Sequence, residues 1–119
     1  MKYISEGIGT FLLVAVVVGS GIMGENLSGG NTAVALLGNT IATGAILFVI
    51  IKMFGMISGA HFNPVVSLVF YIRGELSLKD FFNYILTQVI FGVLAIFVIH
   101  YIFEINILQV SSNIRGEYP

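Results

Sequence analysis

The chain has 119 residues, of which 57% are hydrophobic and only 9% are charged, and its mean hydropathy is +1.01. Soluble domains carry about 25% charged residues, so this composition excludes an ordinary soluble domain and predicts an all-α integral membrane protein. The formal net charge of −1 and the lack of a basic cluster give no indication of nucleic-acid binding, and the absence of cysteine excludes disulfides and thiolate metal sites.

Three long apolar segments reach the roughly 20 residues needed to cross a hydrocarbon core of about 30 Å. We expect spans at about residues 3–23, 32–54 and 81–103, within one unit that covers 1–119. The polar stretch "GENLSGGN" is expected to be the loop between the first two spans. Small residues in the first half of the second span, such as Gly38, predict a face that packs against protein.

Lysine and arginine are distributed unevenly around these spans. With the N-terminus in the cytoplasm, most of them fall on the cytoplasmic side: Lys2, Lys52, Arg73 and Lys79. Only Arg115 falls on the other side. Because cytoplasmic flanks carry the excess of positive charge in membrane proteins, we expect a cytoplasmic N-terminus and a location in the cell (inner) membrane.

A short apolar segment follows the second span, within residues 55–73. Its core "PVVSLVFYI" makes a helix of about 13 Å, roughly half of the hydrocarbon core. Asn63 is a favourable N-cap, and Pro64 is favoured at the first helical position. Both flanking spans meet the cytoplasmic side, so the segment must enter the membrane and return to the same side. The sequence therefore predicts a re-entrant half-helix that starts near the middle of the membrane.

The stretch "SGAHF", residues 58–62, precedes this half-helix. Non-helical backbone at membrane depth is tolerated only where it is buried in protein or lines a water-filled cavity. We expect four carbonyl groups to line such a cavity as hydrogen-bond acceptors, those of Gly59, Ala60, His61 and Phe62. The partial positive charge at the start of the half-helix would oppose cations there.

The sequence "SGAHFNPVV" resembles the first signature loop of the aquaporin, or major intrinsic protein, family, whose usual form is S-G-x-H-x-N-P-A. "EGIGTFLLV" resembles the first helix of that family, which carries E-x-x-G-T. The resemblance runs from about residue 3 to about residue 110 and corresponds to the N-terminal one of the family's two inverted units. It implies half of an aquaporin-like fold, with three transmembrane helices and one half-helix. Val65 departs from the pattern, because the family usually has alanine there.

The resemblance also implies roles for individual residues. Asn63 would donate a hydrogen bond to a permeating molecule, although capping alone is another interpretation. Thr43 stands at the second-helix filter position, where a packing role remains equally open, and Val66 stands where the family's second motif carries a filter arginine. Glu6 would brace the loop through hydrogen bonds to its backbone, unless it reaches the nearby interface instead. His61 would be a vestibule residue or a support for the loop.

The function that this resemblance implies is a passive channel subunit for water and small neutral solutes. The alternative is a non-conducting or regulatory membrane fragment that needs a complementary second half. We do not expect an enzyme, a cofactor or a metal site, because Glu6, His61 and His100 have no ligand-like spacing and no serine lies in a nucleophile motif.

One such unit cannot enclose a pore, so a second half-unit is expected as partner. It would be the same chain in the inverted orientation, or a separate chain that carries the second Asn-Pro motif and the arginine. The lysine and arginine asymmetry argues against dual orientation, and both arrangements stay open, with the homomeric one preferred. The resemblance further implies a higher oligomer with four pores in the lipid bilayer, and no nucleic-acid partner.

Overall fold

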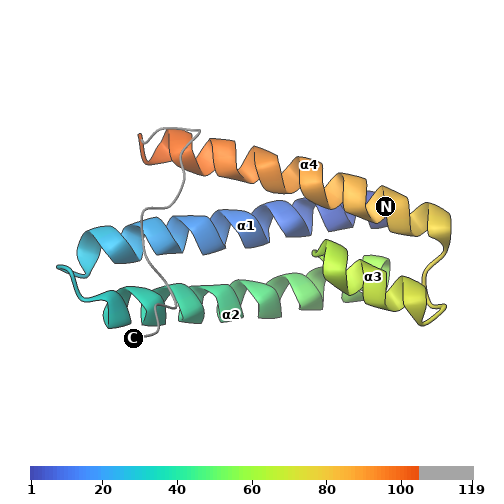
Figure 1. Cartoon of the computed structure of the whole chain (residues 1–119), viewed down its shortest axis with the longest axis horizontal. Coiled ribbons are helices and arrows are strands. Elements are labelled where there is room, and N and C mark those ends of the chain that lie inside the picture. The colour runs from blue at the N-terminus through green and yellow to red at the C-terminus, as the bar shows by residue number, and fades with distance from the viewer. Residues whose placement is uncertain (105–119) are drawn as a thin grey trace, which may run out of the picture.

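The computed structural model describes residues 1–104 (Figure 1). Four helices occupy this part of the chain: α1 (Lys2–Leu27), α2 (Thr32–Ser58), α3 (Pro64–Ile72) and α4 (Leu78–Ile102). Every regular element within it is an α-helix, as predicted, and α1, α2 and α4 are each long and apolar enough to cross a membrane. The Arg115 used in the orientation argument lies outside the described residues.

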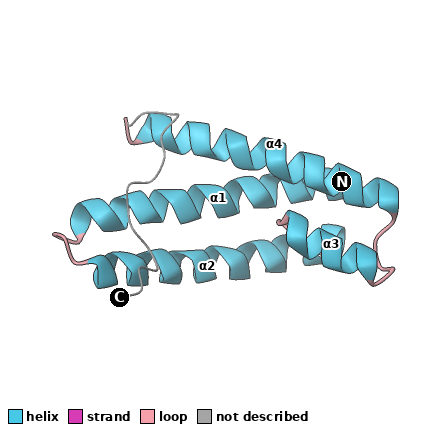
Figure 2. Ribbon diagram, in the orientation of Figure 1, coloured by secondary structure: helices cyan, strands magenta, loops and turns pink. Residues whose placement is uncertain are grey.

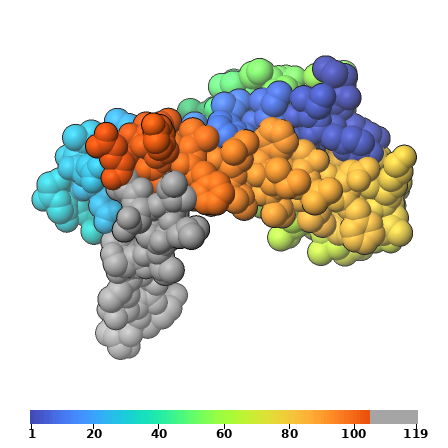
Figure 3. All heavy atoms as spheres, turned by 90° about the horizontal axis from the view of Figure 1, so that it is seen from above, coloured from blue at the N-terminus to red at the C-terminus, as the bar shows by residue number. Residues whose placement is uncertain are grey.

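Helix α1 is the central element of the bundle. It contacts both α2 and α4, and α3 contacts α4. Figures 1 and 2 show α2 and α4 on opposite sides of α1, with α3 near the end of the bundle that holds the N-terminus. In the space-filling view, α4 extends across the face with parts of α1 beside it (Figure 3). The side of α2 that is turned away from α1 therefore has no covering helix within residues 1–104.

Helices α1 and α2 both continue past the ends expected near residues 23 and 54. Residues 24–27, which were expected in a loop, form the last turn of α1. Helix α2 ends where Gly59 takes a left-handed conformation with φ of 88°. Glycine adopts this conformation without a Cβ penalty, so it can stop a helix that apolar side chains would otherwise continue.

The start of α3 confirms the N-cap predicted from the sequence. The side chain of Asn63 accepts a hydrogen bond from the backbone N–H of Val65 at 2.8 Å, and Pro64 occupies the beginning of the helix. The next helix also has a side-chain cap, because Ser77 Oγ accepts from Asp80 N at 3.1 Å. Both short connections are therefore held by capping contacts that the sequence encodes locally.

The packing face predicted for the first half of α2 is not covered within the described part of the chain. A Cβ atom added at Gly38 or Gly44 would meet no atom within 4 Å. Large apolar side chains such as Ile41 and Phe48 are exposed nearby, at 63% and 65%. We call this uncovered side, centred on Ile41, Phe48 and Lys52, the outer side of α2.

Burial is concentrated near the N-terminal end of α1 instead. The largest fully buried side chains are those of Ile50, Gln88, Glu6 and Ser67. All but Ile50 are polar, and they surround the loop between α2 and α3. Because buried polar groups are costly unless they are hydrogen-bonded, this region is the natural place to look for a functional site.

Candidate functional site

Glu6 is the centre of the buried polar region. Its Oε2 accepts hydrogen bonds from Ser58 Oγ at 2.7 Å and from the backbone N–H of His61 at 3.0 Å. Its Oε1 accepts from the backbone N–H of Phe62 at 2.8 Å and from Gln88 Nε2 at 2.9 Å. Its carboxylate thus joins α1 to the end of α2, to the loop and to α4. Glu6 therefore does not reach toward the interface, which was the alternative drawn from the sequence.

The loop at residues 59–62 has an unusual backbone. Ala60 and Phe62 both have a φ of 56°, in the left-handed region that side chains with a Cβ rarely adopt. Such conformations cost about 1–3 kcal/mol each and persist only where surrounding contacts enforce them. Here the N–H groups of His61 and Phe62 are held by Glu6. The carboxylate therefore compensates for the strain of the loop.

A glycine on α1 makes room for the loop. A Cβ atom at Gly9 would lie 2.0 Å from Cε1 of Phe62, so only glycine fits against that ring. The same ring lies edge-on to Phe54, with centroids 6.2 Å apart. Phe62 is 4% exposed, and its side chain anchors the loop to α1 and α2.

The hydrogen bonds to Glu6 also determine where two carbonyl groups of the loop point. In a trans peptide, the C=O of one residue and the N–H of the next point in opposite directions. Because the N–H groups of His61 and Phe62 point at Glu6, the carbonyl oxygens of Ala60 and His61 point away from it. Neither oxygen accepts a hydrogen bond from another group in residues 1–104. Both are therefore available as acceptors.

Asn63 follows these carbonyl groups and is exposed. Its Oδ1 is used in capping α3, where it accepts from Val65 N. Its Nδ2 group donates to no acceptor in the described part of the chain. An amide donor thus lies directly after two carbonyl acceptors, at the start of a short helix.

The structure does not join Thr43 or Val66 to this site by any side-chain hydrogen bond among the described residues. The hydroxyl of Thr43 donates to the carbonyl of Asn39 at 2.8 Å on its own helix, and the residue is half-buried. Val65 is 65% exposed, and Val66 is half-buried on α3. The filter roles of Thr43 and Val66 stay predictions.

His61 is enclosed by side chains from α3 and α4. Its ring stacks on Phe70 with centroids 4.5 Å apart and meets the ring of Tyr84 edge-on at 5.1 Å. Its Nδ1 lies 2.9 Å from Ser67 Oγ. The residue is only 8% exposed, so its ring has a defined orientation.

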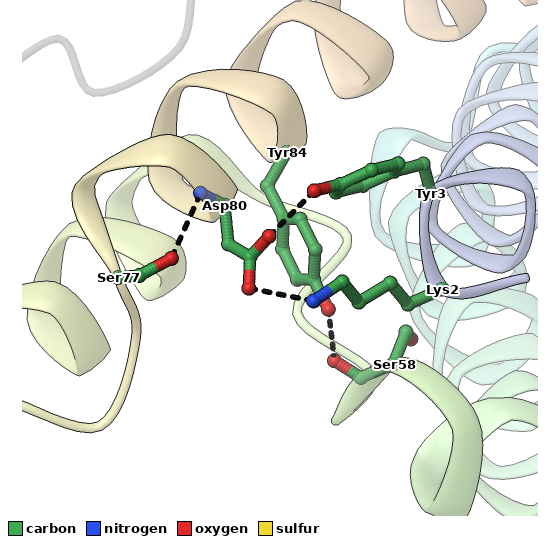
Figure 4. A network of polar contacts seen from close by, with 6 residues as sticks. All are labelled: Lys2, Tyr3, Ser58, Ser77, Asp80 and Tyr84. Carbon is green, nitrogen blue, oxygen red and sulfur yellow. Dashed lines mark hydrogen bonds and ion pairs between the residues drawn. The ribbon is translucent and has the colours of Figure 1, made fainter.

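A second polar cluster connects the helix starts to the loop (Figure 4). The hydroxyl of Tyr84 donates to the carbonyl of Ser58 at 2.7 Å, where α2 ends. The ring of Tyr3 lies edge-on to Tyr84, and its hydroxyl donates to Asp80 Oδ1 at 2.5 Å. Asp80 also forms a 2.6 Å ion pair with Lys2.

The sequence patterns did not single out Ser58, Ser67 or Tyr84 as members of the site. A signal was present in α4, because Tyr84 and Gln88 are one helical turn apart in an otherwise apolar span. Their partners could not be identified from the sequence, since they lie in other helices.

Comparison with known proteins identifies the family. The model of the major intrinsic protein family matches residues 1–116. Aquaglyceroporin AqpS of Rhizobium meliloti (strain 1021) is 46% identical over 114 residues, which are 96% of this chain and 48% of that protein. Aquaporin Z of Photorhabdus laumondii subsp. laumondii is 31% identical over an alignment of 123 positions, gaps included, which covers 98% of this chain and 52% of that protein.

A third relative, aquaporin NIP2-1 of Oryza sativa subsp. japonica, is 47% identical over 70 residues, or 58% of this chain and 22% of that protein. No solved structure gives a significant match. The chain spans about half the length of AqpS and of Aquaporin Z. The family match covers nearly the whole sequence and includes the loop, the short helix and the three apolar helices described above. The chain therefore belongs to the major intrinsic protein family.

Proposed function

We propose that this chain forms one half of a passive membrane channel for water and small neutral solutes. The observation that carries the proposal is the row of polar groups at the start of α3. The carbonyl groups of Ala60 and His61 are turned away from Glu6, and the Nδ2 donor of Asn63 follows them. These uncharged groups could replace the water molecules around a neutral solute that has both hydrogen-bond donors and acceptors. Family membership supports transport rather than catalysis.

The pore requires a second unit that faces the loop. Asn63, Pro64 and Val65 are all exposed, so the start of α3 has no cover within residues 1–104. The second unit would complete the constriction there and would come from a second copy of the chain or from other polypeptide. Val66 would lie at this constriction, and Thr43 would belong to the filter.

The position of Lys52 supports a protein neighbour on the outer side of α2 as well. The hydrogen bond between Ser58 Oγ and Glu6 sets these two residues at one level of the bundle. Lys52 precedes Ser58 by about 9 Å of helix, and Glu6 follows Lys2 by about 6 Å. Because α1 and α2 run in opposite directions (Figure 1), Lys52 lies about 15 Å from the level of Lys2. With the edge of the hydrocarbon core taken at the level of the charged Lys2 and Asp80, that depth is near the middle of a core of about 30 Å.

Lys52 also points away from the rest of the bundle. It follows the buried Ile50 by two positions, a rotation of about 200° around the helix. Its Nζ lies 5.7 Å from the centroid of the Phe48 ring, one turn farther from Ser58. Ionisable side chains at such depth almost always face protein or a water-filled cavity. We therefore infer an oligomer in which the outer side of α2 is covered, in line with assemblies of four pores.

The orientation and the solute class are part of the same proposal. The cations that flank the membrane-spanning segments, Lys2, Arg73 and Lys79, support a cytoplasmic N-terminus, in the cell membrane, without the contribution of Lys52. Among residues 1–104, the segment that follows Asn63 has valine at position 66 and no arginine until Arg73. A constriction built from two such segments would lack a fixed cation and would admit glycerol-sized molecules. The name of the relative AqpS, an aquaglyceroporin, is consistent with that solute class.

Permeability measurements test the proposal. The purified chain is reconstituted into liposomes, alone and together with a second-half unit taken from a full-length relative, and swelling is followed in water and in glycerol gradients. We expect permeability above that of empty vesicles for both solutes. The variant Asn63→Asp should reduce it by about fivefold, because the lost amide donor contributes roughly 1 kcal/mol.

Asn31 provides a matched control, because it caps α2 as Asn63 caps α3. Its Oδ1 accepts from Ala33 N at 3.1 Å and from Val34 N at 3.2 Å. An aspartate preserves the cap in both places, so both variants should fold and only Asn63→Asp should change permeability. Equal permeability of the wild type and Asn63→Asp would refute the pore role of Asn63. No permeability in either reconstitution would favour the non-conducting fragment.

A further inference from the structure

A hydrogen-bonded series of side chains connects α4, α3 and the loop. Gln88 Nε2 lies 2.9 Å from Glu6 Oε1 and 3.1 Å from Ser67 Oγ. Ser67 Oγ lies 2.9 Å from His61 Nδ1. Gln88 and Ser67 are 2% and 0% exposed, so water does not compete for these contacts. We call Gln88, Ser67 and His61 the histidine relay.

The orientation of the Gln88 amide follows from its neighbours. Its nitrogen carries two hydrogens, one for Glu6 and one for Ser67. Turning the amide over would place its oxygen against the carboxylate of Glu6, where both atoms are acceptors. In the observed orientation, Gln88 Oε1 is buried without a partner in residues 1–104. In this orientation Gln88 leaves its own oxygen without a partner, and both of its N–H groups donate, one to Glu6 and one to Ser67.

The hydrogens of the relay then determine the protonation of His61. Ser67 Oγ receives a hydrogen bond from Gln88 and has a single hydrogen to donate. Unlike the hydroxyl of Thr43, it makes no bond to the carbonyl one turn before it on its own helix. The acceptor within reach is His61 Nδ1. When the hydroxyl donates this hydrogen to Nδ1, Nδ1 lacks a proton and the ring hydrogen is on Nε2.

Nε2 lies close to Gly59, the first residue of the loop. A Cβ atom at Gly59 would lie 3.2 Å from it, so Gly59 leaves this nitrogen uncovered. Nε2 has no hydrogen-bond partner among the described residues, and it is not one of their fully buried polar atoms. Two titratable groups lie next to His61. Glu6 accepts a hydrogen bond from its backbone N–H, and the ring of Tyr84 contacts its imidazole ring.

We propose that Gln88 and Ser67 are positioning residues that hold His61 as the neutral Nε2–H form, so that the loop presents an N–H donor in addition to its carbonyl acceptors. The ligand class is a neutral solute with an oxygen acceptor, such as water or a polyol. The solute part of this inference rests on the proposed channel function. The proton position in His61 does not, because it follows from side-chain contacts alone.

Nuclear magnetic resonance can locate this proton directly. The chain contains two histidines, so histidine labelled with ¹⁵N and ¹³C gives few signals in solid-state spectra of the protein in lipid bilayers. The variant His100→Gln assigns them. At neutral pH we expect the protonated nitrogen of His61 to be bonded to Cδ2, as Nε2 is, and the other nitrogen to be unprotonated. A protonated Nδ1 at neutral pH would overturn the proposal.

Variants of Ser67 test whether the relay sets this form. Ser67→Thr retains the hydroxyl and should retain the wild-type spectrum, whereas Ser67→Ala should convert part of His61 to the Nδ1-protonated neutral form. An unchanged spectrum in Ser67→Ala would also overturn the proposal. If Ser67→Ala does not fold, Gln88→Glu decides. A glutamate there has no amide hydrogens for Ser67, so the proportion of the Nε2–H form should fall.

The same samples separate this inference from the proposed channel function. A wild type with the expected Nε2–H signal but no glycerol or water permeability would support the relay and oppose the channel. Permeability together with a protonated Nδ1 would do the reverse.

Discussion

Two sides of the bundle differ in how much of their packing comes from this chain. We call the side around residues 59–62 the loop side of the bundle, and compare it with the outer side of α2. On the loop side, Glu6 accepts hydrogen bonds from α2, the loop and α4, and Tyr84 binds the end of α2. On the outer side of α2, Phe48 and Lys52 are exposed, and no helix in residues 1–104 covers them. The loop depends on contacts within the unit, whereas the outer side of α2 depends on what surrounds the unit.

The physical reason is the difference between polar and apolar groups in a membrane. A backbone N–H at membrane depth without a partner costs several kcal/mol, so the loop must be satisfied when the unit folds. Apolar side chains are nearly as stable in contact with lipid as in contact with protein. An apolar helix face can therefore stay exposed to lipid until the unit assembles with others. Changes on the loop side should therefore act on the isolated chain, and changes on the outer side of α2 on the oligomer.

The largest effect is expected for Glu6→Ala. This substitution removes the acceptor of donors in Ser58, His61, Phe62 and Gln88, and each buried donor left without a partner costs about 1–3 kcal/mol. We expect a loss of roughly 4 kcal/mol or more in the free energy of unfolding. Thermal unfolding in detergent measures it. The control is Glu25→Ala on the exposed end of the same helix, and equal stability of the two variants would contradict the bracing of the loop by Glu6.

Smaller effects on stability, of opposite sign, are expected for alanine substitutions at two glycines. Gly9→Ala places a Cβ atom 2.0 Å from the ring of Phe62 and should destabilise the isolated chain by roughly 1–3 kcal/mol. Gly44→Ala meets open space and should stabilise the isolated helix by about 0.5–1 kcal/mol. Both are measured by thermal unfolding of the chain in detergent. If both variants lost stability in the isolated chain, the distinction between the two sides would be wrong.

The smallest effect on the isolated chain is expected for Lys52→Met. Because Lys52 is exposed and forms no ion pair in the described residues, its replacement should change the unfolding free energy by less than about 0.5 kcal/mol. Assembly should respond instead. We expect the oligomer fraction in lipid nanodiscs, measured by native mass spectrometry, to decrease, while Lys52→Arg and the surface control Lys79→Met preserve it. An unchanged oligomer fraction in Lys52→Met would indicate that this side faces lipid.

Much of the architecture could be predicted from local sequence patterns. Hydrophobic length identified the long helices, and Asn63 followed by Pro64 identified the start of α3. These features depend on neighbouring residues only, such as a cap and a fixed φ. The ends of α1 and α2 were predicted wrongly because they too were judged from neighbouring residues only. The stretch at residues 24–27, which contains Glu25 and Asn26, suggested a loop, but the helix continues to Leu27, and glycines with positive φ reverse the chain at Gly29 and Gly30.

The role of Glu6 was anticipated only through the family resemblance, since an acidic residue in a first span has no local partner. The contacts of Ser67 and Tyr84 were not anticipated at all. Each joins residues from different helices, as when Tyr84 donates to the carbonyl of Ser58. Such pairs depend on the rotation and depth at which helices pack, and hydrophobic periodicity does not specify either in a helix that is apolar on all sides.

The sequence by itself determined that the chain is a helical membrane protein with a short helix that begins at Asn63, because length, hydropathy and capping act over a few residues. Only the tertiary structure decided how the loop before that helix is held. It brought the carboxylate of Glu6 to the N–H groups of His61 and Phe62 and enforced left-handed backbone at Ala60 and Phe62. Those conformations are unfavourable in isolation, and they persist because distant helices supply the hydrogen bonds that compensate for them.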